Sequence, residues 1–200
     1  KDVTDKATVE VVAETLAKIN REIVSDLIRY GSQAVGLSGH DAEILNVVKH
    51  CANGDVGYVG EVTLVNTLPI RELTEFNIIP VISPLGIDKK NEIYNVNADE
   101  AAAKIASAMQ VQKLMILTNV QGIFRDKEDP ASLIPSLHVD EVQDLIQKKV
   151  ITDGMIPKVN SCITALQNGI KKAHIIDGRI KHSLLLEIFT DQGIGTEIAM

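Results

Sequence analysis

The segment KLMILTNVQG, residues 113–122, decides the fold. Lys113 to Leu117 has the length and apolar character of a buried β-strand, and the polar residues from Thr118 onward mark a turn. Helical patterns and β-branched strands alternate along the rest of the chain, without repeats or low-complexity segments. Strands that are separated by helices usually form a mostly parallel sheet with helices on both faces. We therefore expect an α/β fold, a three-layer αβα sandwich with a mostly parallel central sheet.

The first helix is predicted from its cap and its apolar spacing. Thr4 and Asp5 can cap it, Gly31 ends it, and apolar residues recur every three or four positions between them, at Val9, Val12, Leu16, Ile19, Ile23 and Leu27. Further helices are expected over 70–76, from 98 onward, over 140–148, from 155 to 168 and over 183–189. Strands are expected over 34–37, 78–83 (broken by Pro80), 93–96 and 173–176, with a hairpin or edge region over 56–66. A boundary near Gln110 divides the chain into residues 1–110 and 111–200.

The composition argues against several classes of function. Aromatic residues make up 3% of the chain and Trp is absent, so stacking platforms for nucleic-acid bases are not expected. The formal net charge of -7 offers no broadly basic surface to nucleic acid or anionic lipid. The two Cys and five His residues show no metal-binding spacing, so we expect reduced thiols and no bound structural metal. No apolar run approaches the roughly 20 residues that span a bilayer.

Polar residues are concentrated in loops that follow predicted strands, where open α/β sheets bind their ligands. Asn95 and Asn97 share one side of the chain, because side chains alternate along a strand, and Asp99 follows them. They can bind a substrate carboxylate and orient a lysine, or Asn97 and Asp99 can simply cap the next helix. A second loop, residues 118–124, can hold a nucleotide by main-chain groups near Gly122, or it can be an ordinary turn.

A third loop, residues 151–158, brings a lysine to the start of a helix. Pro157 suits a first helical turn, so Lys158 lies near backbone N–H groups and the positive end of the helix dipole. A cation is unfavourable there unless it binds an anionic ligand such as a phosphate. The alternative is a solvated surface lysine. Neither GxGxxG nor GxxxxGK[ST] occurs, so the common dinucleotide and P-loop interpretations have no direct support.

Six motifs occur in a fixed order along the chain: NVNAD (95–99), LTNVQG (117–122), GMIPKV (154–159), IIDGR (175–179), HSLLLEIFT (182–190) and GIGT (193–196). With this series the chain resembles the acetylglutamate kinases of the amino-acid kinase family, from Thr4 almost to its last residue. Residues 118–124 and 127–134 resemble the cyanobacterial and plastid enzymes in particular. The resemblance implies a sandwich of the amino-acid kinase type and transfer of the ATP γ-phosphoryl group, with Mg²⁺, to the γ-carboxylate of N-acetyl-L-glutamate in arginine biosynthesis.

The resemblance also implies roles for individual residues. Lys158 would stabilise the transferring phosphoryl group, Asp99 would hold the catalytic lysines in place, and Asn95 and Asn97 would bind substrate, with Asn95 on its α-carboxylate. Residues 1–110 would then belong to the substrate-binding and dimerisation lobe, and residues 111–200 would form the nucleotide-binding lobe. Contacts with ATP would come from Asn119, Val120, Gln121, Gly122, Ile123, Phe124, Val150, Ile151 and Thr152.

Regulation and assembly are implied as well. The segment with His182, Glu187 and Gly193 resembles the one that binds L-arginine in feedback-inhibited members, and the Glu187 carboxylate suits a guanidinium. Alternatively, Glu187 is an ordinary exposed residue on a helix that packs through its leucines. The family further implies a homodimer or hexamer, a PII-type nitrogen signalling protein as a partner of some members, and a cytoplasmic or plastid location.

The sequence departs from the family pattern at several points. The family has a Lys-x-Gly-Gly loop and a later His-Gly-Gly-Gly loop, and neither occurs here. Asp2 stands where an Arg usually precedes Val-Thr-Asp, and Asn119 stands where the nucleotide loop usually has Asp. We interpret the sequence as a fragment without the N-terminal part, which would be inactive alone. Two alternatives stay open: another kinase of the family acting on aspartate, glutamate or an aminoadipate-type substrate, and a non-catalytic amino-acid-binding regulatory subunit.

Overall fold

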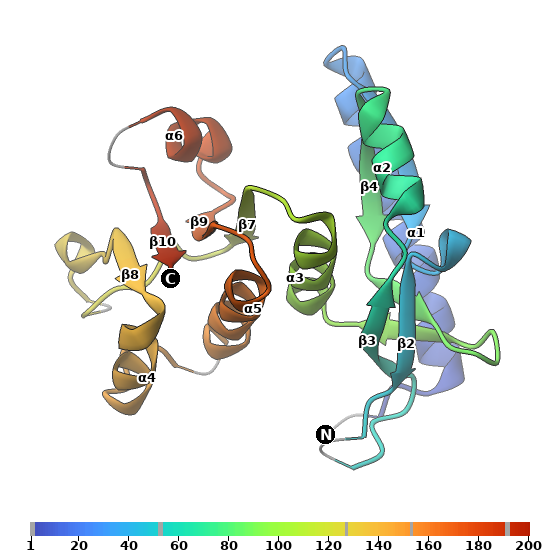
Figure 1. Ribbon diagram of the computed structural model, residues 1–200, viewed down its shortest axis with the longest axis horizontal. Helices are drawn as coiled ribbons and strands as arrows, with labels where there is room; N and C mark the ends of the chain where they lie inside the picture. Colours follow the sequence, from blue (N-terminus) through green and yellow to red (C-terminus); the bar gives the residue numbers. More distant parts are fainter. Residues whose placement is uncertain (1–2, 52–53, 127, 153, 191–192) are drawn as a thin grey trace. The chain divides into compact units, whose positions relative to one another are not determined.

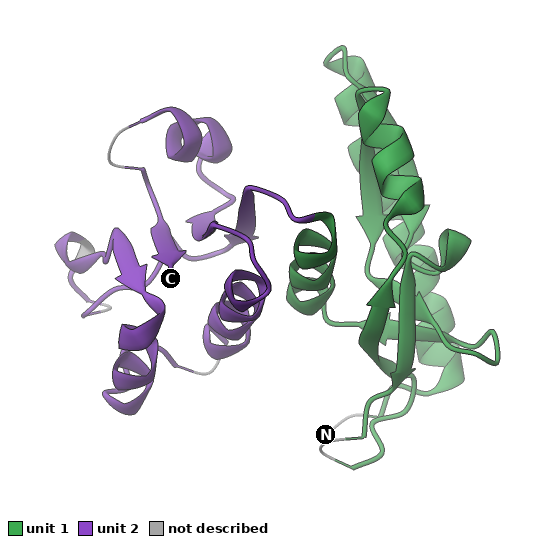
Figure 2. Cartoon of the chain, in the orientation of Figure 1, with its two compact units in different colours: residues 1–109 green, residues 110–200 purple. Residues whose placement is uncertain are grey.

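The computed structural model describes residues 3–51, 54–126, 128–152, 154–190 and 193–200. The chain divides into two compact units, Lys1–Met109 and Gln110–Met200, and each is described by itself (Figure 2). Asp2, Lys127 and Asp153, which belong to segments discussed above, lie outside the described residues. No helix in the described part of the chain is long and apolar enough to cross a bilayer.

The first unit begins with the long helix α1, Lys6–Arg29 (Figure 1). Asp5 caps it, as predicted, by accepting a hydrogen bond from the Thr8 amide at 2.8 Å. The helix packs against β1 (Gln33–Ser38) and β4 (Ile78–Ser83), which pair in parallel, and α2 (Leu68–Glu75) packs against β4.

Pro80 does not break β4, so that prediction is wrong. Pro80 lies opposite Val35 of β1 in a continuous register. A proline lacks an N–H donor but is tolerated on an edge strand, where its nitrogen can face away from the partner. Among the described residues β4 pairs with β1 alone, so the proline leaves the ladder intact.

Helix α1 turns a polar residue toward the strands. Asn20 is 7% exposed, and its Nδ2 donates to the Val81 carbonyl at 2.7 Å and to the Leu37 carbonyl at 3.1 Å. Ile19 and Ile23, from the predicted apolar stripe, are each 45% exposed. The apolar spacing therefore predicted the helix but not its buried face, because buried carbonyls require a donor that no aliphatic side chain supplies.

Four short strands of the first unit close into a small barrel in the order β2-β3-β6-β5. They are β2 (Leu45–Lys49), β3 (Val59–Val65), β5 (Leu85–Ile87) and β6 (Ile93–Val96). The helix α3 (Ala98–Met109) follows β6 directly and packs against β3. The core of this unit is aliphatic apart from one tyrosine, and it consists of Ile44, Leu45, Val47, Val62, Ile70, Tyr94, Val96 and Ala101.

The second unit is built on a four-stranded sheet in the order β7-β9-β10-β8. Its strands are β7 (Lys113–Thr118), β9 (Lys172–Asp177), β10 (Thr196–Ala199) and β8 (Ser136–His138). β7 runs parallel to β9, and β10 runs antiparallel to β9 and parallel to β8. The helices are α4 (Val139–Gln147), α5 (Ile156–Gln167) and α6 (Ser183–Phe189). Figure 1 shows α5 and α6 on either side of β9, which gives this unit helix, sheet and helix layers.

The α/β class with parallel strand pairs is confirmed, and most predicted elements occur within a residue or two of their expected bounds. The described strands lie in a parallel pair, a mixed four-stranded sheet and a small barrel. The predicted edge region over 56–66 contains β3, but its antiparallel partner β2 was not predicted. Strands β5, β8 and β10 were also missed; each is three or four residues long, and of the described strands this short only β6 was predicted.

Candidate functional site

A cavity of about 560 Å³ lies in the second unit, where the parallel strands β7 and β9 end. Thr118 and Asp177, the last residues of these strands, are paired in the register, and both line the cavity. The structure thus brings together most of the predicted nucleotide contacts, since the lining includes Asn119, Val120, Gln121, Gly122, Ile123, Phe124, Val150 and Thr152. Ile151 is 1% exposed and belongs to the core beneath this surface.

The loop over residues 119–124 is fixed to strand β10. The Ile123 amide donates to Thr196 Oγ1 at 2.9 Å, and that hydroxyl donates to the Ile134 carbonyl at 2.7 Å. A Cβ on Gly122 would lie 2.6 Å from Thr196 Oγ1, so only glycine allows this close approach of loop and strand. The main-chain groups that face the cavity are therefore held in place before any ligand arrives.

Lys158 lines the same cavity from the first turn of α5. Pro157 occupies the start of the helix, as predicted, and Met155 at the N-cap provides no side-chain hydrogen bond. The first N–H groups of α5 therefore depend on other acceptors, which an anion can provide. Lysine, helix N-terminus and glycine loop together form a site suited to a phosphate-bearing ligand.

Two further charged residues line this cavity and were not among the predicted site residues. Asp177 ends β9, is 6% exposed, and pairs with Arg179 two residues later. The hydrogen bonds from Arg179 hold the pKa of the Asp177 carboxyl below its ordinary value. Both residues lie in the IIDGR motif, so the signal was present in the sequence, but spacing alone assigned it no role.

The predicted substrate residues lie in the first unit, at the junction of β6 and α3. Asn95 is a half-buried residue of β6, and its amide donates to the Tyr58 carbonyl at 2.9 Å. Asn97 is exposed and accepts a hydrogen bond from the Glu100 amide at 3.1 Å. Asn97 is therefore a helix cap, which was the alternative prediction for it. Asp99 lies in the first turn of α3, and its role in holding the catalytic lysines in place stays a prediction.

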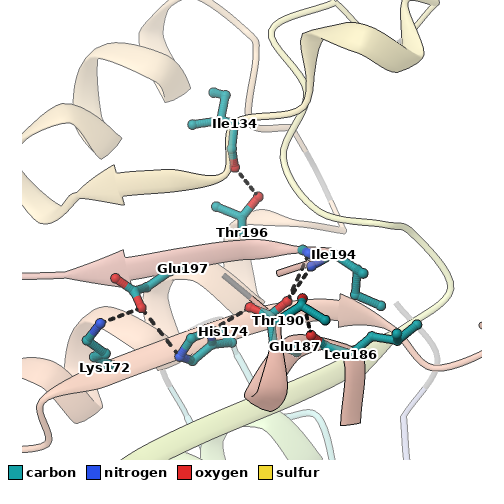
Figure 3. A network of polar contacts seen from close by, with 10 residues as sticks. Ile134, Lys172, His174, Leu186, Glu187, Thr190, Ile194, Thr196 and Glu197 are labelled. Carbon is teal, nitrogen blue, oxygen red and sulfur yellow. Dashed lines mark hydrogen bonds and ion pairs between the residues drawn. The ribbon is translucent and has the colours of Figure 1, made fainter. Parts of the chain in front are cut away.

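Of the predicted effector residues, Glu187 takes part in the polar network that Figure 3 shows. His174 Nδ1 lies 2.7 Å from Glu187 Oε1. The other carboxylate oxygen of Glu187 accepts hydrogen bonds from the amides of Ile194 at 2.7 Å and Gly195 at 3.1 Å. A Cβ on Gly193 would lie 2.8 Å from the same oxygen. The structure thus brings Glu187 and Gly193 together, while His182 is an exposed residue before α6.

The alternative interpretation of α6 is wrong. Glu187 is 9% exposed, whereas the apolar residues around it are exposed, at 41% for Leu184, 54% for Leu185 and 44% for Ile188. The helix is anchored through its carboxylate and not through its leucines. The cause is the main chain of residues 194 and 195, whose buried N–H groups require an acceptor.

No three His, Cys, Asp or Glu side chains within the described ranges are grouped so that they could hold a metal ion.

The sequence matches the amino acid kinase family over residues 1–177. The chain belongs to this family. The acetylglutamate kinase of Moorella thermoacetica is 50% identical to this amino acid kinase over 206 residues, which cover 98% of the chain and 70% of the relative. The acetylglutamate kinase of Petrotoga mobilis is 51% identical over 198 residues, which cover 98% of the chain and 66% of the relative.

A solved structure with a similar fold is N-acetylglutamate synthase from Neisseria gonorrhoeae. In its complex with coenzyme A and N-acetyl-glutamate it has a TM-score of 0.84 and 26% identity, over 99% of this chain and 45% of that chain. In its complex with coenzyme A and L-arginine the TM-score is 0.85, with 25% identity over 98% of this chain and 46% of that chain. The family assignment made from the six motifs is confirmed.

Proposed function

We propose that this amino acid kinase transfers the γ-phosphoryl group of ATP to the γ-carboxylate of N-acetyl-L-glutamate, a step of arginine biosynthesis. The observation that carries the proposal is the cavity of the second unit, where Lys158 and the N-terminus of α5 face a fixed glycine loop. The acceptor follows from relatives that are about half identical along nearly the whole chain and are acetylglutamate kinases.

The reaction places its demands on electrostatics and not on proton transfer. A carboxylate with a pKa of about 4.3 is already ionised at pH 7, so its oxygen attacks phosphorus without a general base. The difficulty is that an anion must approach a polyanion. The Lys158 ammonium and the first N–H groups of α5 would neutralise charge that develops on the phosphoryl oxygens. Mg²⁺ bound to the ATP phosphates would supply further positive charge, as this cation commonly does in kinases.

We assign ATP to the second unit and the acceptor to the first. The lining of the cavity supports the first assignment, because the loop at 119–124 offers main-chain groups and Lys158 offers charge. Asn95 supports the second, because it lies half-buried in β6 between the core residues Tyr94 and Val96. Asp99, in the first turn of α3, keeps the role that the resemblance implies, which is to hold the catalytic lysines in place.

A panel of acceptors tests the proposal. The full-length protein is incubated with ATP, Mg²⁺ and N-acetyl-L-glutamate, L-glutamate, L-aspartate or L-2-aminoadipate, and ADP release is measured. We expect release well above background with N-acetyl-L-glutamate alone. A preference for another acceptor would assign the chain to a different kinase of the family. No release with any acceptor would favour a non-catalytic regulatory subunit.

Replacing Asn95 with alanine is expected to raise the KM for N-acetyl-L-glutamate by about tenfold, the scale of one hydrogen bond to a charged group. The melting temperature should change little, since the backbone bond from Asn95 to Tyr58 survives the substitution. Steady-state kinetics and a thermal melt measure the two effects. The matched control is Asn97→Ala, which removes the cap of α3 and should lower stability by ~1 kcal/mol. An unchanged KM in Asn95→Ala would remove this residue from the acceptor site.

We also propose that L-arginine is an effector and that the protein is a homo-oligomer. The first proposal is supported by the placement of Glu187 and Gly193 side by side near the end of the chain. Because Glu187 is already paired with His174, arginine would have to replace that contact or bind beside it.

The proposal of a homo-oligomer is supported by the exposed apolar side chains of α1, namely Val11, Ile19, Ile23 and Ile28.

A further inference from the structure

The turn that follows β9 presents an arginine to the cavity of the second unit. Arg179 donates through Nε to Asp177 Oδ1 at 3.0 Å and through Nη2 to Asp177 Oδ2 at 2.8 Å. Its backbone N–H donates to Asp177 Oδ1 at 2.9 Å. The guanidinium and the carboxylate are thus joined by two parallel hydrogen bonds, the geometry that fixes an arginine in orientation as well as position.

The support for this arginine is itself rigid. Asp177 is 6% exposed and is paired with Thr118 in the register of β9 and β7. The Gly178 amide donates to the Thr118 carbonyl at 2.9 Å, which ties the turn to the neighbouring strand. The Arg179 side chain is 69% exposed, so its buried partner holds one edge of the guanidinium while the rest stays accessible. The bonds to Asp177 use two of the five N–H donors that a guanidinium carries.

The charges that line the cavity suit a cationic group at the position of Arg179. The described lining residues include two cations, Lys158 and Arg179, and one acid, Asp177. Asp177 alone would repel a polyphosphate, and the chain as a whole carries a formal charge of -7. Pairing with Arg179 balances the charge of Asp177, and most of the Arg179 side chain stays accessible to a ligand.

We propose that Arg179 binds a phosphate group of the nucleotide and that Asp177 positions it for that contact. The proposal rests on the proposed function, because it takes the cavity to be the nucleotide site. Arg179 would then be a second cationic contact for the nucleotide, besides Lys158, and the IIDGR motif would have a role in binding. Arg179 should bind the nucleotide in its ground state, and Asp177, which acts through Arg179, is a positioning residue.

Calorimetric titration of the full-length protein with ADP and with adenosine tests the proposal. In Arg179→Ala the Kd for ADP should rise about tenfold, the loss of one charge-assisted contact, while the Kd for adenosine stays as in wild type. Arg179→Lys should recover only part of the affinity, since an ammonium cannot form two parallel bonds with Asp177. Asp177→Asn should weaken ADP binding less than Arg179→Ala does.

The matched control is Lys181→Ala, which removes the same charge from an exposed position two residues along the chain. It should bind ADP as wild type does, and a melting curve of each variant shows that the fold is intact. Equal ADP affinity in wild type and Arg179→Ala would overturn the role of Arg179 and leave the nucleotide site standing. An equal loss in Lys181→Ala would also overturn it, because the effect would then be a general one of charge. No ADP binding by wild type would overturn the nucleotide site itself.

Discussion

Replacing Lys158 with alanine is expected to lower kcat for phosphoryl transfer by about 10²–10³-fold, the scale of losing one preorganised donor to developing charge. The KM for N-acetyl-L-glutamate should change much less, because the acceptor is assigned to the first unit. The physical reason is the place of Lys158 in the first turn of α5, beside the cavity. There the helix dipole and the ammonium group would act on the same phosphoryl oxygens.

Steady-state ADP release at saturating substrates measures this effect. Lys171→Ala is the matched control, since Lys171 is an exposed lysine of the same unit outside the cavity lining. Its turnover should equal that of wild type. Near-normal turnover in Lys158→Ala would mean that Lys158 is a solvated surface residue, and the phosphoryl-transfer site would have to lie elsewhere.

Replacing Glu187 with alanine is expected to destabilise the protein by about 2–4 kcal/mol, because the substitution leaves buried donors without an acceptor. Those donors are the amides of Ile194 and Gly195 and the ring of His174. Urea unfolding monitored by circular dichroism measures the loss. The control is Leu185→Ala on the same helix, which should cost little because Leu185 is 54% exposed. Equal stability of wild type and Glu187→Ala would show that the carboxylate does not anchor this segment.

The contribution of Glu187 should depend on pH in a defined direction. Burial raises the pKa of its carboxyl, but the hydrogen bonds from Ile194, His174 and Gly195 outweigh burial and leave the pKa below its ordinary value. The ionised form is therefore favoured by folding. Its contribution should be complete above the ordinary pKa of about 4.3 and should vanish as the pH falls through the folded value. The free energies of unfolding of wild type and Glu187→Gln, measured at a series of pH values, should become equal in acid.

The fold could be predicted well where one element has a strong local pattern. The strand at 93–96 and the helix at 183–189 were predicted with the bounds that they have in the structure. The short strands β5, β8 and β10 could not be predicted, because their own residues show no clear strand pattern and they form by pairing with neighbouring strands. The exposed leucines of α6 and the buried Asn20 of α1 show a second limit: apolar spacing identifies a helix, but buried polar contacts can decide which face is covered.

The candidate site divides in the same way. Lys158, Gly122 and the loop residues were predicted from strand ends and helix starts, which are local features, and the structure gathers them around one cavity. Asp177 and Arg179 were missed as site residues because their importance comes from the pairing of β9 with β7. The paired residues, such as Lys113 and Lys172, are 59 positions apart in sequence. The hydrogen bonds from the amides of Ile194 and Gly195 to Glu187 could likewise not be predicted from the sequence.

The most direct test of the central claim is to trap the product. The full-length protein is incubated with ATP, Mg²⁺, N-acetyl-L-glutamate and hydroxylamine, and the hydroxamate that hydroxylamine forms from an acyl phosphate is identified by mass spectrometry. We predict the γ-hydroxamate of N-acetyl-L-glutamate, formed in step with ADP and greatly reduced in Lys158→Ala. ADP formation without any hydroxamate, or a hydroxamate of a different acceptor only, would contradict the account.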